Sequence, residues 1–267
     1  MTERNTAALK DRLLAGDVLV GTFLQTPHPA VAEFAAGLGF DFLCLEGEHS
    51  AMDLATVQNL VRAGNAGGAP MLVRVAQNEW VHIAAALDAG AEGVICPRVN
   101  DGVEARSLVS ACRYPPAGDR GIGPGRATGY GPDSGEQYRV AANRRIVVGA
   151  QVETRGAVER LDSILAVDGL DLVFVGPADL SSCLGLPPGS PGLDQTIRGI
   201  LEKTRAAGKV AGIWAGSDTL AVQWMDSGAQ LVLLASDLIF LARGAMRELE
   251  AVKTRAEKGK VDGYDPR

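Results

Sequence analysis

The sequence of 267 residues has few cysteines and no long hydrophobic run. No stretch approaches the roughly 20 apolar residues that cross a bilayer, and residues 1–17 carry charges where a signal peptide needs an apolar core. The four cysteines form no CxxC pair, which disfavours a zinc–cysteine site and predicts buried thiols: Cys44, Cys96, Cys112 and Cys183. We therefore expect a cytoplasmic protein without a membrane partner.

The chain also lacks a basic surplus. Lys and Arg total 26 against 32 Asp and Glu, so the formal net charge is -6. A protein that neutralises nucleic-acid phosphates normally carries excess positive charge, so we expect no nucleic-acid partner. With 46% hydrophobic and 22% charged residues, the composition is that of a globular protein. Small-molecule chemistry is the expected class of function.

Apolar runs and amphipathic segments alternate along nearly the whole chain. Short apolar runs, many of them β-branched, predict strands at about 18–23, 42–45, 71–74, 94–96, 146–152, 171–175, 210–214 and 230–234. Helices are expected near 5–15, 29–38, 53–66, 80–89, 101–112, 154–166, 195–207, 217–227 and 237–254. Repeated βα units of this number predict an α/β fold, a single (β/α)8 TIM-type barrel with an extra N-terminal helix.

No shift in composition divides the chain into two domains. We predict one barrel over residues 1–252 and a polar C-terminal tail over 253–267. One long irregular stretch, 114–135, is rich in Gly and Pro, and a connection of that length is usually functional or mobile. Within it, the run GIGPGRATG at 121–129 follows two prolines rather than a strand, so it does not predict a dinucleotide site.

Polar residues follow the predicted strands at their carboxyl ends, where this fold places its chemistry. These strand-end residues are Glu46, Glu48, His49, Arg74, Gln151, Glu153 and Asp179. A base, a cation and several carboxylates are therefore expected on one rim of the barrel. No lysine follows a strand in the same way, which disfavours a Schiff-base aldolase.

Glu153 and Asp179 follow adjacent strands and could offer oxygens to a hard divalent cation. Water and a chelating substrate would then fill the remaining positions, as is usual for Mg²⁺ or Mn²⁺. Alternatively, each carboxylate caps the helix that follows it. Spacing alone leaves both interpretations open.

The chain offers only three histidines as an imidazole base. His28 lies in a loop and His82 on a predicted helix, which favours structural or solvated roles for both. His49 ends the second strand beside two carboxylates, and a carboxylate partner would raise its basicity. A surface charge cluster is the alternative for His49. Arg74 closes an apolar strand, so its guanidinium would either grip a substrate oxygen or form a structural salt bridge.

Five motifs around the expected rim are similar to those of a known family. They are GEHS at 47–50, LVR at 72–74, RYPPAGDRGIG at 113–123, QVET at 151–154 and GPADLS at 176–181. In order and spacing the chain resembles, over roughly residues 5–250, the HpcH/HpaI aldolases, which are class II pyruvate aldolases. The resemblance implies metal-dependent aldol cleavage or condensation of a 4-hydroxy-2-oxo acid, to pyruvate plus an aldehyde, through a metal-stabilised pyruvate enolate.

The resemblance also implies roles for individual residues. Glu153 and Asp179 would bind the divalent metal, which would be Mg²⁺, Mn²⁺ or Co²⁺. Arg74 would contact the keto or enolate oxygen of pyruvate, and His49 would be the catalytic base. The family typically has Asp where this chain has Glu46, and that Asp orients the histidine. Glu46 is therefore predicted to orient His49 through a side chain that is one methylene longer.

Further substrate contacts are implied for Gln151, next to the bound substrate, and for the backbone amides of Ala178 and Asp179, which would hold the pyruvate carboxylate. The family suggests a homohexamer of two trimers in which Asp88 reaches a neighbouring subunit's site. The aldehyde pocket is expected from the 114–135 loop and that neighbour.

Two alternatives would share these residues. A related carbon–carbon lyase, either acyl-CoA-dependent or decarboxylating, would keep the metal site and have a different distal pocket. A non-catalytic homologue would bind pyruvate or oxalate without turnover.

Overall fold

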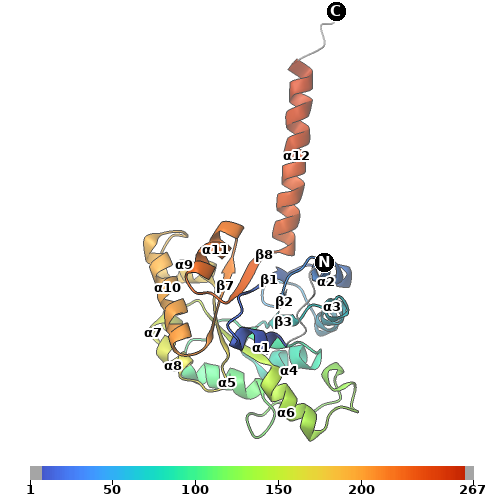
Figure 1. Cartoon of the computed structure of the whole chain (residues 1–267), viewed down its shortest axis with the longest axis vertical. Coiled ribbons are helices and arrows are strands. Elements are labelled where there is room, and N and C mark those ends of the chain that lie inside the picture. Colours follow the sequence, from blue (N-terminus) through green and yellow to red (C-terminus); the bar gives the residue numbers. More distant parts are fainter. Residues whose placement is uncertain (1–7, 262–267) are drawn as a thin grey trace, which may run out of the picture.

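The predicted (β/α)8 barrel is confirmed by the computed structural model, which describes residues 8–261 and the side chains of residues 8–256. Parallel strands close into a barrel in chain order, and the last strand pairs with the first (Figure 1). The strands are β1 Leu19–Leu24, β2 Phe42–Glu46, β3 Met71–Arg74, β4 Gly93–Cys96, β5 Val147–Val152, β6 Leu172–Val175, β7 Val210–Ala215 and β8 Leu231–Ser236.

Helices surround this barrel, and several begin at a side-chain cap. The carboxylate of Asp53, for example, accepts a hydrogen bond from the Thr56 amide at 2.7 Å at the start of α3. The helices are α1 Leu9–Leu14, α2 Pro29–Gly37, α3 Leu54–Ala66, α4 Trp80–Asp88, α5 Gly102–Cys112, α6 Glu136–Arg145, α7 Arg155–Glu159, α8 Leu161–Leu165, α9 Pro177–Leu184, α10 Pro191–Ala206, α11 Asp218–Asp226 and α12 Asp237–Val261.

The helices differ from the prediction in three places. The segment expected as one helix over 154–166 is divided into α7 and α8, because Arg160 leaves the helical conformation (φ -108°, ψ 19°). α9 lies at 177–184 and α6 at 136–145, and the set of predicted helices included neither. Ala142 is the one buried residue of α6, so α6 shows no apolar stripe that would reveal it in the sequence.

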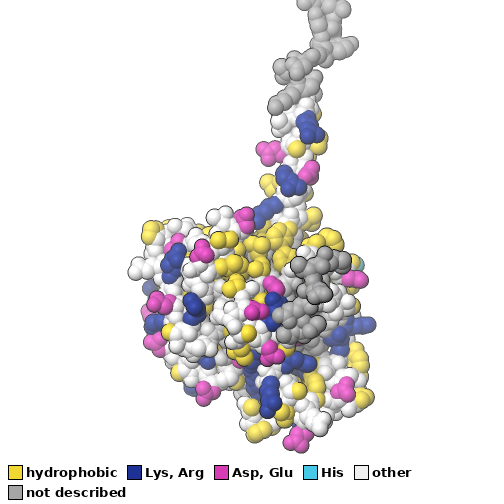
Figure 2. Space-filling model, viewed as in Figure 1, with side chains coloured by type: hydrophobic (Ala, Val, Ile, Leu, Met, Phe, Trp, Pro, Cys, Tyr) yellow, Lys and Arg dark blue, Asp and Glu magenta, His cyan; other side chains and the backbone are white. Residues whose placement is uncertain are grey.

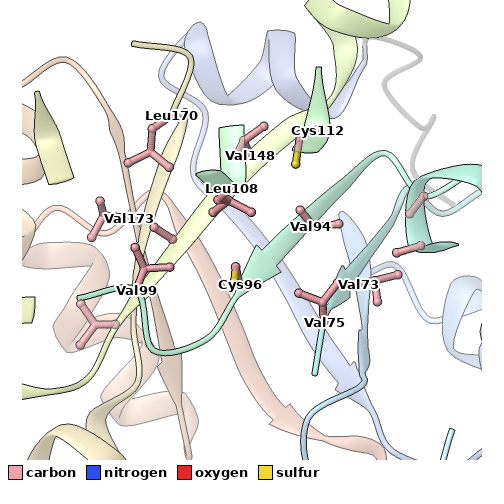
Figure 3. Close-up of a cluster of buried hydrophobic side chains, with 14 of the residues drawn as sticks. Val73, Val75, Val94, Cys96, Val99, Leu108, Cys112, Val148, Leu170 and Val173 are labelled. Atoms are coloured by element: carbon pink, nitrogen blue, oxygen red, sulfur yellow. The ribbon is translucent and has the colours of Figure 1, made fainter. Parts of the chain in front are cut away.

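Two apolar layers hold the barrel together. The inner one fills the barrel with side chains such as Phe42 and Leu172, and α1 adds Leu9 and Leu13 to it. The outer one lies between the strands and the helices, where Figure 3 shows the valines of β3 to β6 with Leu108 of α5. All four cysteines are free; Cys44, Cys96 and Cys112 are buried as predicted, whereas the prediction is wrong for Cys183, which is exposed.

α12 projects away from the barrel (Figure 1). It continues to Val261, so the predicted start of the tail at 253 falls inside this helix, and residues 262–267 lie outside the described part of the chain. Several apolar side chains of α12 are exposed, among them Leu241, Met246 and Val252. Over residues 8–261, none of the helices is long and apolar enough to span a membrane.

Candidate active site

A cavity of about 210 Å³ opens at the carboxyl ends of the strands. One side of it is polar and is formed mainly by Glu46, His49, Arg74, Gln151 and Asp179. Three aromatic side chains also line the cavity: Phe23, Phe174 and Trp214. Most of the predicted site residues are therefore brought together on one rim. The sequence did not predict these aromatic residues as part of the site, although each lies one residue before the end of an apolar strand.

Glu46 and Arg74 form a buried ion pair at the centre of the polar side. The register of β2 and β3 places the two residues opposite each other, and they are 2% and 9% exposed. Arg74 donates from Nε to Glu46 Oε1 at 3.1 Å and from Nη2 to Glu46 Oε2. Its guanidinium carbon also lies 4.7 Å from the centre of the Phe23 ring. Arg74 thus forms an ion pair with a strand-end acid, as one of its two interpretations expected, and its role toward a substrate stays a prediction.

His49 has a different carboxylate neighbour from the one that we predicted. Glu46 Oε1 accepts hydrogen bonds from the backbone amides of Glu48 (2.8 Å) and His49 (3.1 Å), which fixes the loop but does not reach the ring. The carboxylate nearest the imidazole is Glu48, with Oε2 at 3.8 Å from Nε2. The expected contact between Glu46 and the His49 ring is thus replaced, because Arg74 occupies the Glu46 carboxylate.

Glu153 is held in place by two donors. Its Oε1 accepts from the Arg98 amide at 2.8 Å, and its Oε2 accepts from the Gln151 side chain. The capping interpretation of Glu153 is wrong, because Thr154 is the residue that caps α7. Gly176 allows the backbone to approach Glu153 closely, since a Cβ at Gly176 would lie only 2.6 Å from Oε2.

Asp179 lies exposed in the first turn of α9, so its capping interpretation is also wrong: the N-cap of this helix is Gly176. The first intrahelical bond there runs from the Leu180 amide to the Gly176 carbonyl at 3.0 Å. The amides of Ala178 and Asp179 therefore have no partner inside the helix, and the helix dipole adds partial positive charge at this end. This is suitable geometry for a substrate carboxylate.

Asp88 and the 114–135 loop lie elsewhere. Asp88 ends α4, away from the rim, and accepts a hydrogen bond from Arg120 Nη2 at 2.8 Å. None of the described loop residues lines the cavity that contains Arg74. His28 caps α2 by accepting from the Ala30 amide at 3.2 Å, which confirms its structural role.

The carboxylates of Glu153 and Asp179 suit a divalent cation. Burial raises the pKa of Glu153, and the nearby charges of Glu48 and Asp179 raise it further. Burial likewise raises the pKa of Glu48, whose Oε2 is buried without a hydrogen-bond partner. A cation would offset this repulsion. Over the described residues no group of three or more His, Cys, Asp or Glu is placed to hold a metal, so protein ligands would be few.

The match to known proteins covers most of the chain. The model of the HpcH/HpaI aldolase/citrate lyase family matches residues 19–242. The chain belongs to this family. The 4-hydroxy-2-oxo-heptane-1,7-dioate aldolase of Salmonella arizonae is 40% identical over 253 residues, which are 94% of this chain and 95% of that protein.

Two solved structures extend the comparison. An HpcH/HpaI aldolase/citrate lyase family protein from Burkholderia cenocepacia has a TM-score of 0.87 and 32% identity, and the match covers 92% of this chain and 98% of that one. The citrate synthase SbnG has a TM-score of 0.85 and 30% identity, with 94% and 99% covered. With its family and its aldolase relatives, the chain is a carbon–carbon lyase.

Proposed function

We propose that this family member cleaves a 4-hydroxy-2-oxo acid to pyruvate and an aldehyde, and condenses them in reverse. The observation that carries the proposal is the rim cavity, where Asp179, the buried Arg74 and the exposed His49 face one small volume. Glu153 does not line this cavity but accepts a hydrogen bond from Gln151, which does. Glu153 and Asp179 would hold the divalent cation, which we propose is Mg²⁺, Mn²⁺ or Co²⁺. When bound, the cation supplies Lewis-acid polarisation of the 2-oxo group.

The substrate is oriented by groups on β3 and α9. Its carboxylate accepts hydrogen bonds from the amides of Ala178 and Asp179, next to the cation ligands. Arg74 Nε and Nη2 are occupied by Glu46, whereas Nη1 makes two long contacts, 3.4 Å each, to Gln151 and Glu48. Nη1 therefore donates to the 2-oxo oxygen and stabilises the negative charge that develops there.

His49 moves the proton. Its ring is 59% exposed at the cavity mouth, where it can reach the C4 hydroxyl of the substrate. His49 removes that proton, the C3–C4 bond breaks, the aldehyde forms, and the electron pair enters the enolate of pyruvate. Protonation of the enolate at C3 then completes pyruvate. Glu48 stabilises the imidazolium, because its carboxylate is the one nearest the ring.

The reaction is tested by following pyruvate with lactate dehydrogenase across a panel of 4-hydroxy-2-oxo acids. We expect pyruvate release with Mn²⁺ and none in EDTA. No lysine is among the residues that line the cavity, so borohydride should trap no substrate on the protein. Borohydride trapping, or no release from any member of the panel, would contradict the proposal.

A second candidate is carbon–carbon bond formation with a different acceptor. The similarity to a citrate synthase over most of both chains supports it. An acyl-CoA-dependent or decarboxylating reaction would use the same rim residues. It is distinguished from the aldolase reaction by whether coenzyme A esters or release of carbon dioxide accompany turnover.

We also propose that the chain acts in the cytoplasm as a homo-oligomer, a trimer or hexamer. Figure 2 shows hydrophobic side chains gathered where α12 leaves the barrel, and exposed Leu241, Met246 and Leu249 continue this apolar surface along the helix. Exposed apolar surface of this kind supports an interface with further copies of the chain. The free cysteines support a reducing compartment. Light scattering of the full chain tests the assembly, and a monomer would contradict it.

A further inference from the structure

A second cavity lies at the opposite end of the barrel from Arg74. Its volume is about 580 Å³. Pro70, Glu92 and Ile146 line it, and each immediately precedes one of the strands β3, β4 and β5. The cavity is therefore on the amino-terminal face, where this fold does not place its catalytic groups. Its volume is in the range of small-molecule sites.

Three arginines from the 114–145 region line this cavity: Arg120, Arg126 and Arg145. Glu92 is the one acidic residue among the described residues that line it. Burial raises the pKa of Glu92, which favours its neutral form, although Arg145 opposes the shift. The cavity is thus positively charged in a chain whose net charge is -6.

Much of the hydrogen-bonding capacity of these arginines is unused. Arg126 donates from Nη1 to the Ala89 carbonyl at 3.0 Å, and neither Arg126 nor Arg145 has an ion-pair partner within 4.0 Å among the described side chains. Arg120 is 2% exposed and pairs with Asp88, but its Nε and Nη1 have no hydrogen-bond partner. Buried donors without partners are costly, and converging guanidinium groups are suited to carboxylates and phosphates.

We propose that this cavity binds a small organic polyanion that carries two or more carboxylate or phosphate groups. Arg126 and Arg145 contact its anionic groups, and Arg120 supports them from the buried side. Tyr138 and Ile146 add aromatic and apolar wall, which suits an organic body rather than a bare inorganic ion. A site here lies at the opposite end of the barrel from the rim cavity, so it is separate from the pyruvate site of the same chain.

The test is calorimetric titration of the full chain with citrate and, separately, with pyrophosphate, in EDTA and at 0.15 M salt. Acetate serves as the monovalent comparison. We expect one citrate or pyrophosphate per chain, much weaker binding of acetate, and the same affinity in saturating pyruvate. The better of the two probes identifies carboxylate or phosphate as the preferred group. No binding of either probe, or its loss in pyruvate, would overturn the proposal.

Variants locate the site. Arg126→Gln and Arg145→Gln should each raise Kd by on the order of tenfold, because each removes a charge-assisted hydrogen bond. Arg144→Gln is the matched control, since Arg144 is exposed beside Arg145 on α6 and does not line the cavity. Its affinity should stay that of the wild type. Equal weakening in Arg144→Gln would show only general attraction to positive charge and would also overturn the proposal.

Discussion

Replacing Glu46 with glutamine tests whether the buried Glu46 carboxylate pairs with Arg74 or with His49. Glu46→Gln keeps the side-chain size, and its amide oxygen can still accept from the Glu48 and His49 amides. The loop that carries His49 therefore stays in place. The change removes the negative charge opposite Arg74, a residue that is only 9% exposed.

The expected loss of unfolding free energy follows from this burial. Removing one partner of a buried ion pair costs about 3–5 kcal/mol of unfolding free energy. Arg74 keeps contacts to Glu48 Oε2 at 3.4 Å and to the Phe23 ring, so we expect the lower end, about 3 kcal/mol. For a chain of this size such a loss lowers the melting temperature by about 6–12 °C. Thermal unfolding followed by circular dichroism measures it.

Glu48→Gln is the matched control for the melting temperature of Glu46→Gln. It is also the variant in which we expect the rate, rather than the stability, to fall. Glu48 Oε2 has no hydrogen-bond partner and burial already disfavours its charge, so this change should lower the melting temperature far less. Its rate loss should resemble that of His49→Ala, and the double variant should lose little more, because the two residues act as a unit. Two results together would refute the pairing of Glu46 with Arg74: a wild-type melting temperature for Glu46→Gln, and rate losses of Glu46→Gln and His49→Ala that are fully coupled. They would instead support the predicted contact between Glu46 and His49.

Three further results are expected. EDTA should abolish pyruvate release and added Mn²⁺ should restore it, because Glu153 and Asp179 alone bind the cation modestly; full activity in EDTA would contradict this. Arg74→Ala should raise the activation barrier in kcat/KM by about 2.7–4 kcal/mol and also lower the melting temperature, because Glu46 remains buried without its cation. Glu92→Gln should stabilise the fold near pH 7–8, as measured by urea unfolding. Because burial raises the pKa of Glu92, the folded state binds this proton more tightly than the unfolded chain, and stability is lost as pH rises through the folded pKa. The gain should therefore shrink as pH falls toward about 4.3, and a gain that grows on acidification would contradict this reasoning.

The barrel was predictable because each βα unit carries its own local signal. Strands such as 210–214 are short apolar runs that follow a helix ending in glycine, and all eight lie within two residues of their predicted positions. α6 lacked that signal, since a helix with one buried residue has no periodic apolar face. The break at Arg160 was equally hidden, because the residues on both sides of it favour a helix.

The rim residues were also predictable, since strand order and strand ends together determine which side chains gather on one face. Their partners were not. In the sequence His49 is three residues from Glu46, whereas Arg74 is separated from it by 28. The parallel register of β2 and β3 places Arg74 directly opposite Glu46, and a buried carboxylate pairs with the cation that it meets across the sheet. The basic cavity at the other end has the same origin, because it joins segments from residue 8 to residue 146 that are adjacent only once the barrel closes. Local pattern determined the elements and the rim; the closure and register of the sheet decided which charges meet.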